Sequence, residues 1–203
     1  MRRALLLAAA VGALALPAGA TAGSAAAITV FHAFTSAGEP ALATTAARGY
    51  CWTGSIAADR RDAWRCFVGN EIHDPCFSAA AAPGIVLCPN PELTHATEIH
   101  LTKPLPTAMA DHAAPSVHSR PWLIELGASR AAGTAGARCE AVTGASSQVD
   151  GVAERYFCTG ALASMGLWGA PAHGAAGWSI RIAPDSAGSL AGAVRVAIEH
   201  MWV

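Results

Sequence analysis

Apolar and polar residues alternate with a period of two along most of the readable chain. Short alternating runs begin at Ile28, Gly84, Thr97, Pro121 and Gly177. The last run sets Val194, Val196, Ile198, His200 and Trp202 against Arg195, Ala197, Glu199 and Met201. Turn residues separate these runs, and no convincing helical period appears after the first residues. The pattern predicts a mostly β fold, an antiparallel sandwich or barrel of short strands.

Residues 1–22 have the features of a secretory signal peptide. A positively charged start is followed by an uninterrupted apolar run from Ala4 to Leu16, and small residues place the cleavage near residues 20–22. The run is shorter than the roughly 20 residues that span a membrane. We therefore expect residues 23–203 to form a single all-β domain of a secreted, extracellular protein that has no membrane contact after signal removal.

Two segments interrupt the alternating pattern. The stretch 103–121 is punctuated by prolines and is predicted to be a long surface loop. The stretch that starts at Gly127 is rich in glycine and alanine and is predicted to be a flexible connection. The 103–121 loop could divide the domain into two lobes.

Six cysteines in an exported chain predict disulfide bonds, because the compartment outside the cytoplasm is oxidising. Two pairs of cysteines lie near the ends of an apolar segment, a polar tip and a returning apolar segment, which is the pattern of a β-hairpin. We therefore predict the pairs Cys51–Cys66, Cys139–Cys158 and, by elimination, Cys76–Cys88. Each closure would contribute about 3 kcal/mol of stability. The close cysteine spacings of zinc sites are missing from the sequence.

Charge and motifs exclude several classes of function. The formal net charge is −1, and Lys103 is the only lysine, so the chain lacks the cationic face that nucleic-acid binding needs. No phosphate-binding glycine loop, dinucleotide fingerprint or G-x-S-x-G motif is present. The sequence therefore predicts no cofactor and no nucleic-acid partner.

The histidines do not predict a metal site. His95 and His100 are five positions apart, which places them on opposite faces of a strand and far apart around a helix. Asp111, His112 and His118 share the proline-rich loop, which is a poor platform for a set of ligands.

Seven acidic residues with apolar neighbours are candidates for acid–base chemistry: Asp62, Glu71, Asp74, Glu98, Glu125, Glu140 and Glu154. A secreted hydrolase could use a carboxylate–histidine group such as Asp74 with His73, although neighbours in a strand point to opposite faces. The charged residues 59–62 lie where the first hairpin is predicted to turn, so we expect them to be exposed to solvent.

Six tryptophans are many for a chain with two tyrosines. Trp52, Trp64, Trp168 and Trp178 lie beside glycine or cysteine or within the segment GLWGAP. Tryptophans in a β core commonly pack on a disulfide. Exposed tryptophans on a rigid scaffold would instead form a ligand face. We take these four as the candidate ligand face, with cell-wall carbohydrate or another extracellular protein as the partner.

The segments CWTGS, RDAWRC, GNEIHDPCF and VLCPNP resemble a group of exported cysteine-rich proteins of high-GC Gram-positive bacteria, a group with no assigned activity. The resemblance covers mainly residues 50–90, with weaker likeness in PWLIEL and RYFCTG. It implies export and a shared cysteine scaffold and carries over no catalytic residue. We therefore expect a secreted, disulfide-stabilised binding protein of the cell envelope or the extracellular space, with a hydrolase as the alternative.

Overall fold

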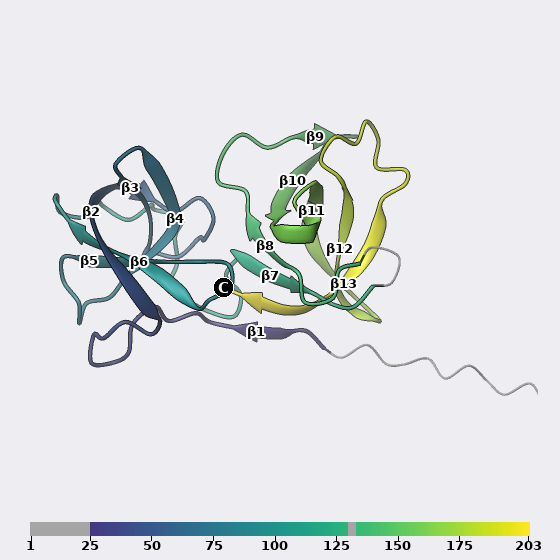
Figure 1. Cartoon of the computed structure of the whole chain (residues 1–203). Coiled ribbons are helices and arrows are strands. Elements are labelled where there is room, and N and C mark those ends of the chain that lie inside the picture. Colours follow the sequence, from purple (N-terminus) through teal and green to yellow (C-terminus); the bar gives the residue numbers. More distant parts are fainter. Residues whose placement is uncertain (1–24, 130–132) are drawn as a thin grey trace, which may run out of the picture.

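The computed structural model describes residues 25–129 and 133–203, which form an all-β molecule (Figure 1). The predicted fold class is confirmed, while the predicted signal peptide lies outside the described residues. The strands of the first half are β1 (Ala27–Thr29), β2 (Ala43–Gly54), β3 (Ala63–Val68), β4 (Glu71–Ser78), β5 (Ile85–Pro89) and β6 (His95–Leu101). Those of the second half are β7 (Leu123–Leu126), β8 (Arg138–Ala141), β9 (Gln148–Val149), β10 (Val152–Cys158), β11 (Met165–Gly174), β12 (Gly177–Pro184) and β13 (Val194–Trp202). A short 3-10 helix, η1 (Gly160–Leu162), precedes β11.

Strands β2 to β6 form a closed barrel, which we call the first barrel. Each strand pairs antiparallel with the next, so the first and the fifth strand run in the same direction. The barrel therefore closes through a parallel pair, β2 with β6. Closure leaves no free sheet edge in this half of the molecule.

The second half forms a larger sheet in the order β13, β12, β11, β10, β8 and β7. An additional antiparallel pairing of β13 with β7 closes these six strands into a ring, which we call the second barrel. An even number of antiparallel strands closes with an antiparallel pair, in contrast to the five strands of the first barrel. Strand β1 adds to β13 in parallel, and β9 pairs with β10.

The three predicted disulfides, Cys51–Cys66, Cys76–Cys88 and Cys139–Cys158, are confirmed. The first joins directly opposed residues of β2 and β3, and the third joins directly opposed residues of β8 and β10. The second links β4 to β5. All six cysteines are buried, so each bond staples neighbouring strands inside one barrel.

Aromatic side chains join the two barrels. Phe31, Phe77 and Trp122 pack as a triad with ring centroids 5.3 to 5.6 Å apart. Phe77 belongs to the first barrel, Trp122 precedes β7 of the second, and Phe31 follows β1. All three are buried and belong to one hydrophobic cluster that extends into both barrels. Figure 1 shows the barrels side by side, with the end of β13 between them.

A buried arginine completes this junction. Arg60, 1% exposed, lies in the loop between β2 and β3. Its Nε and Nη2 donate to the two carboxylate oxygens of Asp62 at 3.0 and 2.7 Å. Its Nη1 donates to the main-chain oxygens of Phe31 and Val203 at 2.9 and 2.7 Å, and its Cζ lies 4.7 Å from the ring centroid of Phe77. The guanidinium group thus ties a loop of the first barrel to β1 and β13.

The expectation that residues 59–62 form a solvent-exposed tip is wrong for Arg60. The loop folds back against the second barrel, where main-chain oxygens and Asp62 replace the hydration of the guanidinium group. The next residue, Arg61, is exposed as expected.

Replacing Arg60 with methionine should destabilise the folded protein by about 3–5 kcal/mol, because Asp62 and two main-chain oxygens would lose a buried charged donor. Chemical unfolding with the disulfides intact measures the free-energy change. Arg61→Met, an exposed neighbour, is the matched control and should change stability little. Equal stability of the two variants would show that the buried guanidinium group does not hold the junction.

Candidate functional site

A pocket of about 220 Å³ opens between the two barrels. One wall comes from β4 of the first barrel and includes Ile72 and His73. The opposite wall comes from Trp122, from Glu140 on β8 and from Phe157 on β10. Pockets at the interface of two domains are frequent ligand sites, so this inter-barrel pocket is the first candidate.

The wall formed by β4 contains a β-bulge. Two residues, Asp74 and Pro75, lie between the β4 partners of Cys66 and Trp64, whereas β3 has only Arg65 there. Proline has no amide hydrogen to give to a ladder, so a bulge is one of the few places where it fits a sheet. The bulge redirects the side chains around it.

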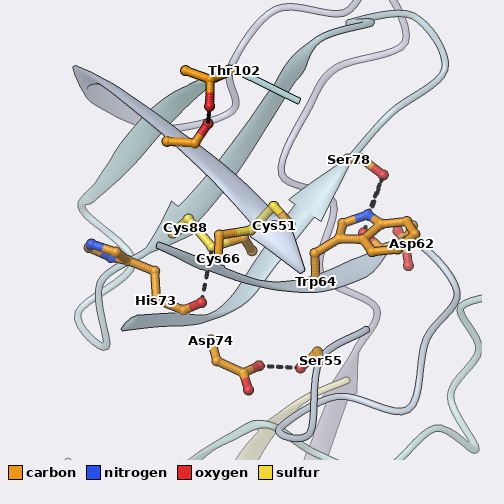
Figure 2. The surroundings of a disulfide bond; sticks show 12 residues. Cys51, Ser55, Asp62, Trp64, Cys66, His73, Asp74, Ser78, Cys88 and Thr102 are labelled. Atoms are coloured by element: carbon orange, nitrogen blue, oxygen red, sulfur yellow. Dashed lines mark hydrogen bonds between the residues drawn. A yellow bond between two sulfur atoms is a disulfide. The ribbon is translucent and has the colours of Figure 1, made fainter. Parts of the chain in front are cut away.

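Asp74 is a structural residue. Its carboxylate accepts hydrogen bonds from the hydroxyl of Ser55 and from the backbone N–H of Ile56. Burial raises its pKa, and these hydrogen bonds and Arg65 oppose the rise. The side chain is fully buried, and Figure 2 shows it turned toward Ser55, whereas the side chain of His73 points elsewhere. The two neighbours therefore do not form an acid–base pair.

Glu140 is the titratable carboxyl of the pocket. Its residue pairs with Leu123 on one side and with Phe157 on the other, which places it on the wall that faces the first barrel. Burial, reinforced by the negative charge of Glu92, raises the pKa of the Glu140 carboxyl to about 7. Near neutral pH this carboxyl can therefore either donate or accept a hydrogen bond.

Two ring nitrogens in the pocket walls are buried and have no hydrogen-bond partner among the described residues: Nε1 of Trp122 and Nε2 of His73. Trp122 is 1% exposed, and its indole N–H can act only as a donor. Burial lowers the pKa of His73, and Glu71 opposes this effect. An unpaired buried polar group costs about 1–3 kcal/mol, so each of these two nitrogens carries such a cost.

A row of aromatic residues, with Trp52 exposed and Tyr50 and Phe67 half-buried, runs along the first barrel. This aromatic strip consists of Tyr50, Trp52 and Phe67. Trp52 stacks on Phe67 with ring centroids 4.3 Å apart, and Tyr50 lies 5.7 Å from Phe67. Two cations flank the strip, since Lys103 Nζ lies 4.0 Å from the Tyr50 ring centroid and Arg65 Cζ lies 5.4 Å from that of Trp52.

The aromatic strip continues into the inter-barrel pocket. Phe67 and Ile72 are directly paired in β3 and β4, so their side chains share one face of the sheet. Ile72 is 47% exposed and lines the pocket, and Phe157 lies on its opposite wall with 39% exposure. The strip and the pocket therefore form one surface, apolar along the first barrel and polar between the barrels.

Two of the four tryptophans predicted to form a ligand face are not available to a ligand. Trp64 is 5% exposed and donates from Nε1 to the hydroxyl of Ser78, as Figure 2 shows. Trp168 is 1% exposed and packs with Ala183. Both side chains are part of a hydrophobic core, so the prediction that they form a ligand face is wrong for Trp64 and Trp168. Trp52 is 38% exposed, and Trp178 is half-buried on the second barrel.

The seven acidic candidates do not come together. Asp62 and Glu125 pair with arginines, Glu71 and Glu98 lie beside histidines, and Glu154 lies beside Asp185. The other two, Asp74 and Glu140, line the inter-barrel pocket. Trp122 was missed, because nothing in its local sequence shows that it lies between two barrels.

The histidines considered for metal binding are engaged elsewhere. His95 bonds to Thr45, and His100 lies 2.9 Å from a carboxylate oxygen of Glu98. His112 is buried and donates from Nδ1 to the main-chain oxygen of Arg60 at 3.0 Å. Within the described ranges, no three side chains of His, Cys, Asp or Glu lie close enough to hold a metal ion.

Comparisons of the chain with known protein families, with curated proteins and with solved structures find no match. No helix in the described part of the chain is long and apolar enough to cross a membrane. The three disulfides indicate an extracellular or otherwise oxidising environment.

The raised pKa of Glu140 makes the stability of the protein depend on pH. The carboxyl titrates at about 7 in the folded state against 4.5 ordinarily, so between these values the folded protein holds a proton that the unfolded chain has released. Stability should therefore fall as pH rises through this range and level off above it.

Glu140→Gln removes the titrating proton, so its unfolding free energy should fall less than that of the unmodified protein between about pH 5 and about pH 8. Chemical unfolding at the two pH values measures the difference. Glu39→Gln, on an exposed loop, is the matched control. An equal fall in Glu140→Gln and the unmodified protein would show that Glu140 does not titrate in this range.

Proposed function

We propose that this protein is a secreted binding protein of the cell envelope or the extracellular space, and that its ligand is a saccharide chain. The observation that carries the proposal is the continuous surface of the aromatic strip and the inter-barrel pocket. Rings of Trp52 and its neighbours offer flat apolar faces at low entropic cost. The pocket offers the polar groups that fix orientation, as in other small-molecule sites.

Export is part of this proposal. The signal-like residues 1–22 and three buried disulfides support it. The resemblance of residues 50–90 to exported proteins of high-GC Gram-positive bacteria supports a bacterial source. Disulfide Cys51–Cys66 joins the two strands that carry the aromatic strip, so the rings sit on a stapled hairpin and lose little freedom on binding.

The charges around the aromatic strip restrict the class of ligand that can bind there. Aromatic faces also bind cations, but here Lys103 and Arg65 already occupy positions beside Tyr50 and Trp52. A cationic ligand would be repelled by them, whereas a neutral or acidic saccharide would not. In the pocket, sugar hydroxyls could pair with the Glu140 carboxyl.

Calorimetric titration with a cello-oligosaccharide, an oligogalacturonate and a chitosan oligosaccharide tests the proposal. The neutral or the acidic oligosaccharide should bind, the cationic one most weakly, and Trp52→Ala should weaken binding about tenfold or more. Val194→Ala, an exposed apolar residue on the second barrel, is the matched control. Absence of binding to all three probes, or unchanged binding by Trp52→Ala, would contradict the proposal.

A hydrolase is the second candidate, because a carboxyl with a pKa of about 7 suits a general acid. A paired-carboxylate mechanism needs a second accessible carboxyl, and the side chain of Asp74 is fully buried. We therefore expect the bound oligosaccharide to remain intact on long incubation, as measured by the release of reducing ends. Release that Glu140→Gln abolishes would instead establish the hydrolase.

A further inference from the structure

A second hollow is lined by other residues than the inter-barrel pocket and by none of the aromatic strip. It consists of a polar part of about 400 Å³ and an apolar part of about 500 Å³. Arg120, Ala170 and Pro171 line both parts, so the two are adjacent. Each part has the size of an ordinary small-molecule site. We call this feature the second groove.

The apolar part is lined mainly by hydrocarbon. Trp178 of β12, Met201 of β13 and Ile28 of β1 form its floor and sides, and Val117 of the 103–121 loop lies at its edge with 50% exposure. An apolar chain placed here would remove Val117 and the exposed parts of Ile28 and Trp178 from water, at about 25 cal/mol for each Å² buried, with the already buried Met201 beneath it.

The polar part contains two arginines. Arg155 is the extra residue of a register shift in β10, which lies between the partners of Trp168 and Leu167. Such bulges re-aim a side chain. Arg120 is held by its backbone N–H to Asp59 at 2.9 Å and by its Nη2 to the main-chain oxygen of Ile56 at 2.7 Å.

The positive charges of both guanidinium groups affect the pKa of the Tyr156 hydroxyl. The positive charges of Arg120 and Arg155 oppose burial and Asp59, which together raise the pKa of the Tyr156 hydroxyl to about 12. That hydroxyl donates to the main-chain oxygen of Pro121, which lines the apolar part. Arg120 lines both parts and so lies where they meet, and Arg155 lines the polar part.

The charge of the arginines is not neutralised within the described residues, where neither forms an ion pair with a carboxylate. Glu154 also lines the polar part, but its carboxyl lies over Gly166 beside Asp185. Burial and the charge of Asp185 raise its pKa. The carboxyls of Glu154 and Asp185 therefore lie on the side of Gly166, and Asp59 is held on the backbone N–H of Arg120.

We propose that the second groove binds a single-chain amphiphile with a carboxylate head, of the fatty-acid type. The chain lies along Trp178 and Met201, and the carboxylate pairs with Arg155 and Arg120. Arginine matches a carboxylate through two parallel N–H donors, so the head group is fixed in orientation as well as in charge.

Titration of the disulfide-bonded protein with dodecanoate below its micellar concentration tests this proposal. Dodecanoate should bind with one-to-one stoichiometry, and dodecyltrimethylammonium, which has the same chain and the opposite charge, should bind about tenfold more weakly or worse. Arg155→Gln should weaken dodecanoate binding several-fold, and Arg195→Gln, an exposed arginine outside the groove, should not. Equal binding of the two amphiphiles, or no effect of Arg155→Gln, would overturn the proposal.

A second variant tests the apolar part. Val117→Glu places a negative charge at the exposed edge of the groove, so dodecanoate binding should be lost while the thermal unfolding temperature stays unchanged. Trp52→Ala should leave dodecanoate binding intact, and Val117→Glu should leave oligosaccharide binding intact. The two proposed binding sites are therefore tested independently of each other. Undiminished dodecanoate binding by a folded Val117→Glu protein would place the ligand elsewhere and refute the groove.

Discussion

The arrangement of the two barrels depends on one buried charge. The guanidinium group of Arg60 is almost fully removed from water, and such a group is tolerated only when its donors are satisfied. Asp62 supplies the counter-charge from the same loop, and the main-chain oxygens of Phe31 and Val203 supply acceptors from β1 and β13. Because Val203 follows β13 of the second barrel and Phe31 follows β1, which pairs with β13, the loop is satisfied only when the barrels are docked. The ring of Phe77 beneath the guanidinium group links this polar contact to the aromatic triad.

A fixed junction explains the chemistry of the pocket beside it. Glu140 belongs to the second barrel, and the surroundings that raise its pKa include the first barrel, since both barrels line the pocket. Trp122 takes part in the triad through its ring and leaves its indole nitrogen buried without a partner. The hydrophobic contact that joins the barrels therefore also places an unpaired donor in the pocket wall. Unpaired buried polar groups are rare in folded proteins, so such a group at this position is a notable feature of the junction.

Sequence patterns predicted those parts of the fold in which the type of each residue reflects its local environment. Alternation in β12 and β13 reflects one-sided burial, and opposed cysteines reflect a hairpin, so both were predictable. Strand β11 was not, because its glycines, alanines and Pro171 carry little β propensity and its conformation comes from pairing with β10 and β12. The burial of Arg60 could not be predicted either, because two of its acceptors are backbone oxygens, which every residue carries whatever its type. The pocket was hidden for a related reason, since Ile72 and Glu140 meet only through the docking of two barrels.

The positions of the disulfides determine how the contact between the barrels is stabilised. Each bond lies within one barrel, so none of the three disulfides crosses the junction. The barrels are stapled individually, while the contact between them rests on Arg60, the aromatic triad and the surrounding apolar packing. A ligand in the inter-barrel pocket would contact Ile72 on one side and Glu140 on the other, and would therefore add to the contacts between the two barrels. Ligands that bind only the docked state stabilise it by mass action, so a saccharide bound there would strengthen the junction that forms its own site.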